Sequence, residues 1–173
     1  GIDAGSVLLA WGIGYVLALN VIGGRDGAMG INQSLLLNAF LFVEIACMQR
    51  YGLFIGHPLF AAVAVLVGFL VFAGAGSLVA ARLRQRPGAV NWAVVGIVLL
   101  LLLQTVALPP PPGVVEATAG RVAATLALIA PLAFLMGMPF PLGLSRLANE
   151  APAYIPWAWG INGCASVLSA LLA

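Results

Sequence analysis

The stretch from Pro58 to Ala81 reads PLFAAVAVLVGFLVFAGAGSLVAA and contains no charged side chain. A helix that crosses the hydrocarbon core of a bilayer, ~30 Å thick, needs about 20 consecutive apolar residues. This stretch is long enough, has a proline at its first position, where helices accept one, and is followed directly by Arg82. It therefore predicts a membrane-spanning helix.

The composition of the whole chain supports the same class of protein. Hydrophobic residues make up 63% of the sequence, charged residues make up 7%, and the mean hydropathy is +1.13. A soluble domain has about 25% charged residues, so this chain has too few to cover a water-exposed surface. All seven basic residues are Arg, and they form no basic stripe with interleaved aromatic residues, which excludes a nucleic-acid-binding protein.

Five further apolar segments predict helices. Together with the first stretch they indicate an all-α, polytopic transmembrane bundle of about six spanning helices, forming one domain over residues 1–173. The chain begins at Gly1 and ends inside an apolar segment, so we expect it to be a fragment of a longer polypeptide. Pro131, Pro139 and Pro141 are expected to interrupt the fifth helix. The further segments are Gly5–Ile22, Asn32–Tyr51, Val90–Leu108, Thr118–Leu144 and Pro156 to the end of the chain.

The distribution of Arg residues predicts the orientation of these helices. The loops after the first, third and fifth helices share one side of the membrane and hold five of the seven Arg residues. The positive-inside rule makes that side cytoplasmic. The opposite side then receives Arg50 and His57. The five Arg residues are Arg25, Arg82, Arg84, Arg86 and Arg146.

Glu44 is the most informative single residue, because it lies in the middle of the second predicted helix. A charged carboxylate at such a place costs at least ~2.5–3.5 kcal/mol, so it must be protonated, paired or turned toward a wet interior. Two interpretations stay open. Glu44 is either a proton or cation site, or a structural partner of Arg50 or of a polar group on the last helix.

Other polar positions and helix breaks are weaker candidates. Gln49 and Arg50 follow Glu44 on the same helix, and His57 is expected to mark a helix start rather than bind a metal. Asn162 begins a polar stripe that suits helix packing better than a pathway. Pro139 and Pro141 break the fifth helix and free backbone carbonyls, which either surround an ion or simply kink the helix; the kink is favoured. No catalytic centre, metal site or cofactor site is recognisable.

Small residues recur at four-residue steps in the third helix, in the pairs Ala73/Ser77 and Gly76/Ala80. Such faces let two helix backbones approach closely in a membrane. They therefore predict a packing seam between the third helix and a neighbour.

Four motifs taken together resemble the membrane-embedded part of bacterial spermidine synthase-like proteins. In that family an aminopropyltransferase-type domain is joined to transmembrane helices. The resemblance runs from about Asn32 to the end of the chain and implies a bacterial cytoplasmic membrane location. The family's aminopropyl chemistry belongs to a soluble domain that this sequence lacks, so no catalytic residue is carried over. The motifs are Phe42–Arg50 (FVEIACMQR), Leu53–Pro58 (LFIGHP), Phe134–Gly143 (FLMGMPFPLG) and Pro156–Gly163 (PWAWGING).

Three functions compete on this basis. The first is a non-catalytic scaffold or accessory subunit, surrounded by lipid and bound to other membrane subunits or to a missing soluble domain. The second is transport or binding of a small cationic molecule, such as a polyamine, at a site centred on Glu44. The third, a membrane enzyme, is the weakest, because one intramembrane Glu and one His leave too few reactive groups.

Overall fold

The computed structural model describes residues 29–86, 88–106, 118–150 and 152–172. The described part of the chain is helical and contains no strand, which confirms the predicted all-α class. The predicted helix Gly5–Ile22 lies outside the described residues. The elements are α2 (Met29–Ile55), α3 (Pro58–Leu83), α4 (Ala89–Val106), α5 (Thr118–Met136), α6 (Pro139–Glu150), the short 3-10 helix η1 (Pro152–Tyr154) and α7 (Ile155–Leu172).

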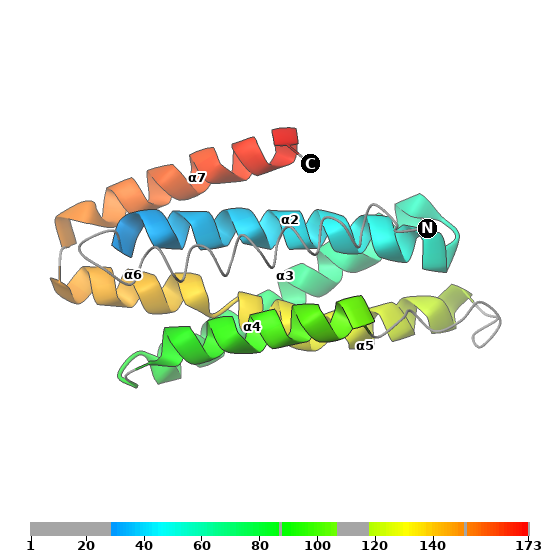
Figure 1. Ribbon diagram of the computed structural model, residues 1–173, viewed down its shortest axis with the longest axis horizontal. Coiled ribbons are helices and arrows are strands. Elements are labelled where there is room, and N and C mark those ends of the chain that lie inside the picture. Colours follow the sequence, from blue (N-terminus) through cyan, green and yellow to red (C-terminus); the bar gives the residue numbers. More distant parts are fainter. Residues whose placement is uncertain (1–28, 87, 107–117, 151, 173) are drawn as a thin grey trace.

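The helices lie roughly side by side and alternate in direction (Figure 1). α2, α4 and α7 run one way, whereas α3 and α5 run the other way, and α6 continues in the direction of α5. The α3–α4 turn and the α6–α7 junction therefore share one end, at the left of Figure 1. We call it the arginine end, because Arg82, Arg84, Arg86 and Arg146 lie on the segments that meet there.

The turn between α2 and α3 explains why α3 begins where the sequence predicts. Gly56 has a φ of +79°, a left-handed conformation that glycine adopts without steric cost. His57 is extended, with φ −135° and ψ 104°, and precedes Pro58 at the start of α3. Pro58 needs no helical hydrogen bond at that position, and its fixed φ suits the first turn. The predicted start of the third helix is thus confirmed.

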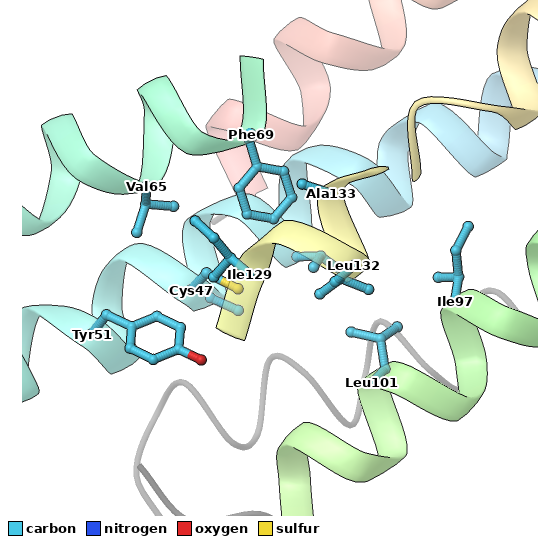
Figure 2. Packing of buried hydrophobic residues seen from close by; sticks show 11 residues of the cluster. Cys47, Tyr51, Val65, Phe69, Ile97, Leu101, Ile129, Leu132 and Ala133 are labelled. Atoms are coloured by element: carbon cyan, nitrogen blue, oxygen red, sulfur yellow. The ribbon is translucent and has the colours of Figure 1, made fainter. Parts of the chain in front are cut away.

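The main core lies where α2, α3, α4 and α5 meet, as Figure 2 shows. Phe69 of α3 is fully buried there and meets the ring of Phe40 of α2 edge to face, with ring centroids 5.5 Å apart. Edge-to-face pairs of this kind add to the dispersion energy of close packing. The buried members of the core are Val43, Ala46, Cys47, Tyr51, Val65, Phe69, Ile97, Leu101, Ile129, Leu132 and Ala133.

α3 and α5 form the most extensive helix pair, and their backbones touch near the arginine end of α5. A Cβ atom added at Gly76 would overlap the backbone carbonyl oxygen of Phe134. A Cβ added at Gly137, just after α5, would overlap the carbonyl oxygen of Ala73. The predicted small-residue seam on the third helix is therefore a real contact, and its Gly76 side faces α5.

Two stretches of the described chain are long and apolar enough to cross a membrane: Pro58–Leu83, with 26 residues, and Thr118–Asn149, with 32 residues, which spans α5 and α6. Only 28% and 33% of their most apolar windows are buried. The central helix of a soluble protein would be mostly buried, because its apolar side chains need cover from water. The number of spans beyond these two stays a prediction.

Two details of the fifth predicted helix differ from expectation. Pro131 does not interrupt it, because α5 continues past Pro131 to Met136. The break comes at Gly137 and Met138, and α6 then starts at Pro139 and runs to Glu150, beyond the predicted end at Leu144. A single proline removes one helical hydrogen bond, whereas Pro139 and Pro141 together remove two N–H donors within three residues.

Candidate functional site

Glu44 and Arg50 lie on the buried side of α2, and each is 6% exposed. Glu44 and Arg50 are six positions apart, so their side chains point about 120° apart around the helix axis, and Cys47 lies between them. Cys47 is fully buried, and Tyr51 is 2% exposed. Cys47 and Tyr51 belong to the same core cluster as Ile129 of α5, and Figure 2 shows Cys47 close to Ile129. α2 thus carries a strip of polar and ionisable groups into the packed interior.

Among the residues that the structure describes, Glu44 forms no ion pair and no hydrogen bond. In particular, Glu44 forms no ion pair with Arg50, so the pairing of these two residues that the sequence suggested is not found. A buried carboxylate without a partner is costly, and the cost falls when the group is protonated or binds a cation. A proton or cation site at Glu44 stays a prediction.

Gln49 and His57 lie apart from that strip, and both are exposed. Gln49 lines an open hollow of about 450 Å³ where the last turns of α2 meet the start of α3. A Cβ at Gly52 would meet nothing within 4 Å, so the missing side chain leaves that part of the hollow open. The His57 ring instead packs against the ring of Phe60, with centroids 5.8 Å apart. The hollow is lined by Met48, Gln49, Gly52, Leu53, Gly56 and Pro58.

The break around Pro139 is packed inside the bundle, because Met138 and Pro139 are buried. The N–H of Gly137 donates to the carbonyl of Ala133 at 3.0 Å, and the N–H of Met138 donates to that of Leu135 at 3.1 Å. These bonds use carbonyls near the break, and Gly137 lies against the backbone of α3. This packing is what a structural kink requires. The side chain of Asn162, the last candidate, lies outside the described residues.

Arg121 was not among the sequence-based candidates, yet it connects two helices. Its Nη1 donates to the carbonyl of Phe54 at 3.2 Å, in the last turn of α2. Carbonyls at a helix C-terminus lack helical partners, and a cation there is also attracted to the negative end of the helix dipole. Thr125 is fully buried and donates from its hydroxyl to the carbonyl of Arg121 at 2.9 Å. The signal that could have identified this contact in the sequence is a single Arg, placed four residues before a Thr on an apolar helix.

Gln104 is the second polar residue that sequence reasoning missed. Its Nε2 donates to the carbonyl of Leu128 on α5 at 3.0 Å. Leu128 is adjacent to Ala127 on α5. In a regular helix the N–H of residue 131 would donate to the carbonyl of Ala127, but Pro131 has no N–H. Gln104 is buried, and its Oε1 has no hydrogen-bond partner among the described residues. A Gln directly after the apolar run of α4 could have identified this interhelical contact.

These groups do not form one cluster. Glu44 and Arg50 lie inside, Gln49 and His57 lie outside, and the proline break lies beside α3. Among the described residues, no three His, Cys, Asp or Glu side chains come together as a metal site would require. Comparison with protein-family models, curated proteins and solved structures finds no match to the chain.

Proposed function

We propose that this chain is a membrane-embedded helical domain that acts as a non-catalytic scaffold or accessory subunit in a larger membrane assembly. The observation that carries the proposal is the apolar outer surface of α3. Leu59, Leu70 and Leu78 are 76%, 72% and 75% exposed, at the start, middle and end of that helix. Large apolar side chains along a whole helix need lipid or a partner protein around them.

The packing of the interior favours a structural role over a pathway. Apolar side chains from four helices fill the described core, and the backbones of α3 and α5 touch at Gly76 and Gly137. Close backbone contact of this kind makes a rigid helix pair. A rigid pair with an apolar outer face is suited to hold neighbouring membrane subunits in place.

The finer assignment, to the membrane part of a spermidine synthase-like protein in a bacterial cytoplasmic membrane, depends on the four motifs quoted above. The described structure places these motifs at α2, at the α2–α3 turn, at the α5–α6 break and at α7. They therefore belong to the segments where the bundle turns, breaks or buries polar groups.

The scaffold proposal is tested by photo-crosslinking in bacterial membranes. A photoreactive amino acid at Leu70 or Leu78 is expected to give one discrete adduct with another membrane subunit, which also co-purifies in mild detergent. Val65, which is fully buried on the same helix, is the matched control and is expected to give no such adduct. A stable lone monomer, with the same result at Leu78 and Val65, would contradict a scaffold role.

A second function, binding or transport of a small polyamine-like cation, is favoured by one observation. Glu44 is 6% exposed and forms no ion pair with another described residue. In vesicles reconstituted with the protein, Glu44→Gln is expected to abolish spermidine uptake, because it removes the negative charge and keeps the shape. Gln49→Asn, at the exposed hollow, is the control and should leave uptake unchanged. Equal uptake by the native and Glu44→Gln proteins would eliminate this function.

A further inference from the structure

The arginine end of the bundle concentrates positive charge on a short turn. α3 ends at Leu83 and α4 begins at Ala89, and the side chains of Arg82, Arg84 and Arg86 between and beside these ends are all exposed. The N–H of Arg86 donates to the carbonyl of Leu83 at 3.0 Å, which makes the turn tight. Three guanidinium groups are thereby held within five residues at the tip of an apolar helix.

The turn is also fixed by its glycine and a tryptophan. Gly88 has a φ of +79°, which other residues rarely adopt. A Cβ at Gly88 would lie 3.9 Å from Nε1 of Trp92, so the indole ring lies close to the turn. Trp92 is 76% exposed in the first turn of α4. An exposed indole on the same short turn as exposed Arg side chains is typical of the boundary between acyl chains and headgroups.

The other segments at this end repeat the same combination. Arg146 lies on α6, and Tyr154, Trp157 and Trp159 follow at the junction with α7, all three exposed. Trp159 is held by an edge-to-face contact with Phe140 of α6, with ring centroids 5.1 Å apart. Figure 1 shows the α6–α7 junction at the same end of the bundle as the α3–α4 turn. Aromatic rings thus accompany the Arg residues on both segments.

Among the side chains that the structure describes, no exposed carboxylate lies beside these Arg residues. Glu44 is the carboxylate among the described side chains, and it is buried within α2. The backbone of Glu150 ends α6 at the arginine end, so the described segments there carry four Arg against one Glu. The Nε of Arg84 donates to the carbonyl of Ala81 at 3.0 Å, and a guanidinium group has four further N–H donors that can bind an anion.

We propose that the α3–α4 turn binds anionic phospholipid headgroups, with Arg82, Arg84 and Arg86 contacting the phosphate and Trp92 contacting the adjoining glycerol and acyl region. This inference rests on the proposed membrane location. Guanidinium groups bind phosphate oxygens with two parallel N–H donors, and the cytoplasmic leaflet is the one that carries anionic lipid. The exposed apolar face of α3 leads directly up to the cluster, so the ligand is lipid in the bilayer and not a free anion.

The test uses Trp92 as the only tryptophan, with Trp11, Trp157 and Trp159 changed to Phe. The full chain is reconstituted in phosphatidylcholine bilayers that contain a minority of phosphatidylglycerol, and one lipid at a time carries brominated, fluorescence-quenching acyl chains. Brominated phosphatidylglycerol is expected to quench Trp92 more than its bulk share predicts. One basic contact is worth ~1 kcal/mol near an anionic surface, so a local enrichment of about fivefold per contacting Arg is expected.

Two variants identify the cause of the enrichment. Changing Arg82, Arg84 and Arg86 together to Gln should abolish it, whereas changing the same three to Lys should keep most of it. Native protein that is quenched equally by both lipids, relative to their amounts, would overturn the proposal while leaving membrane insertion intact. Absence of quenching by either lipid would instead show that Trp92 is not in a bilayer, which contradicts the proposed membrane function itself. Loss of the enrichment on adding soluble glycerol phosphate would identify a free-anion site and overturn the lipid assignment.

Discussion

Gly76→Ala is expected to destabilise the bundle by about 1–3 kcal/mol or more, whereas Gly74→Ala on the same helix should have no unfavourable effect. The new methyl group at Gly76 would overlap the carbonyl oxygen of Phe134, which belongs to the backbone and cannot change rotamer. α3 and α5 would have to separate, and the core beside them would lose contacts.

Gly74 is a strict control for this effect, because a Cβ there would meet nothing within 4 Å. Alanine is a better helix former than glycine by up to about 1 kcal/mol, so Gly74→Ala should be neutral or stabilising. Unfolding of the purified protein in mixed micelles with increasing dodecyl sulfate, followed by helical circular dichroism, measures both variants. Equal midpoints for Gly76→Ala and Gly74→Ala would disprove the close contact of α3 with α5.

Leu70→Arg is expected to make the free energy of inserting α3 into the membrane less favourable by ~2.5–3.5 kcal/mol. This is the cost of a basic side chain at the centre of a spanning helix. Leu70 lies in the middle of α3 and is 72% exposed, so the new guanidinium group would lie at the centre of the membrane in apolar surroundings, whether lipid or a partner helix covers it. In a soluble protein the same surface substitution would change stability by only about ±0.5 kcal/mol. The substitution therefore distinguishes a membrane-embedded helix from a water-facing one.

Leu59→Arg provides the comparison, since Leu59 is equally exposed but lies at the second position of α3. From there an Arg side chain can extend to the headgroup region, so a much smaller effect is expected. The fraction of each variant that resists alkaline extraction from bacterial membranes measures integration. Equal integration of the Leu70→Arg and native proteins would contradict a membrane-spanning α3.

Local sequence signals predicted the features that depend on neighbouring residues. Pro58 after His57 marked the start of α3, and Pro139 with Pro141 marked the break before α6. Both follow from the missing N–H of proline, which acts within one turn of helix. Pro131 shows where this reasoning fails, because α5 stays helical through the single hydrogen bond that this proline removes.

Contacts between helices could not be derived in the same way. Arg121 caps α2 by reaching Phe54, and Gln104 reaches Leu128. Both acceptors are backbone carbonyls, which every residue possesses, so no residue type in the sequence identifies them. The same limit applies to Gln49 and Glu44. Both are polar residues of α2, yet one lies at an open hollow and the other in the interior.

The apolar stretch Pro58–Ala81 thus determined by itself that this segment is a helix, where it begins and that its length suits a bilayer. Those properties follow from hydropathy, from the geometry of proline and from the rise per residue of a helix. Only the tertiary structure decided that Gly76 faces the backbone of α5 while Gly74 and Leu70 face outward. An all-apolar helix has no polar face to orient it, so its rotation is set by which small residues let a neighbouring backbone approach.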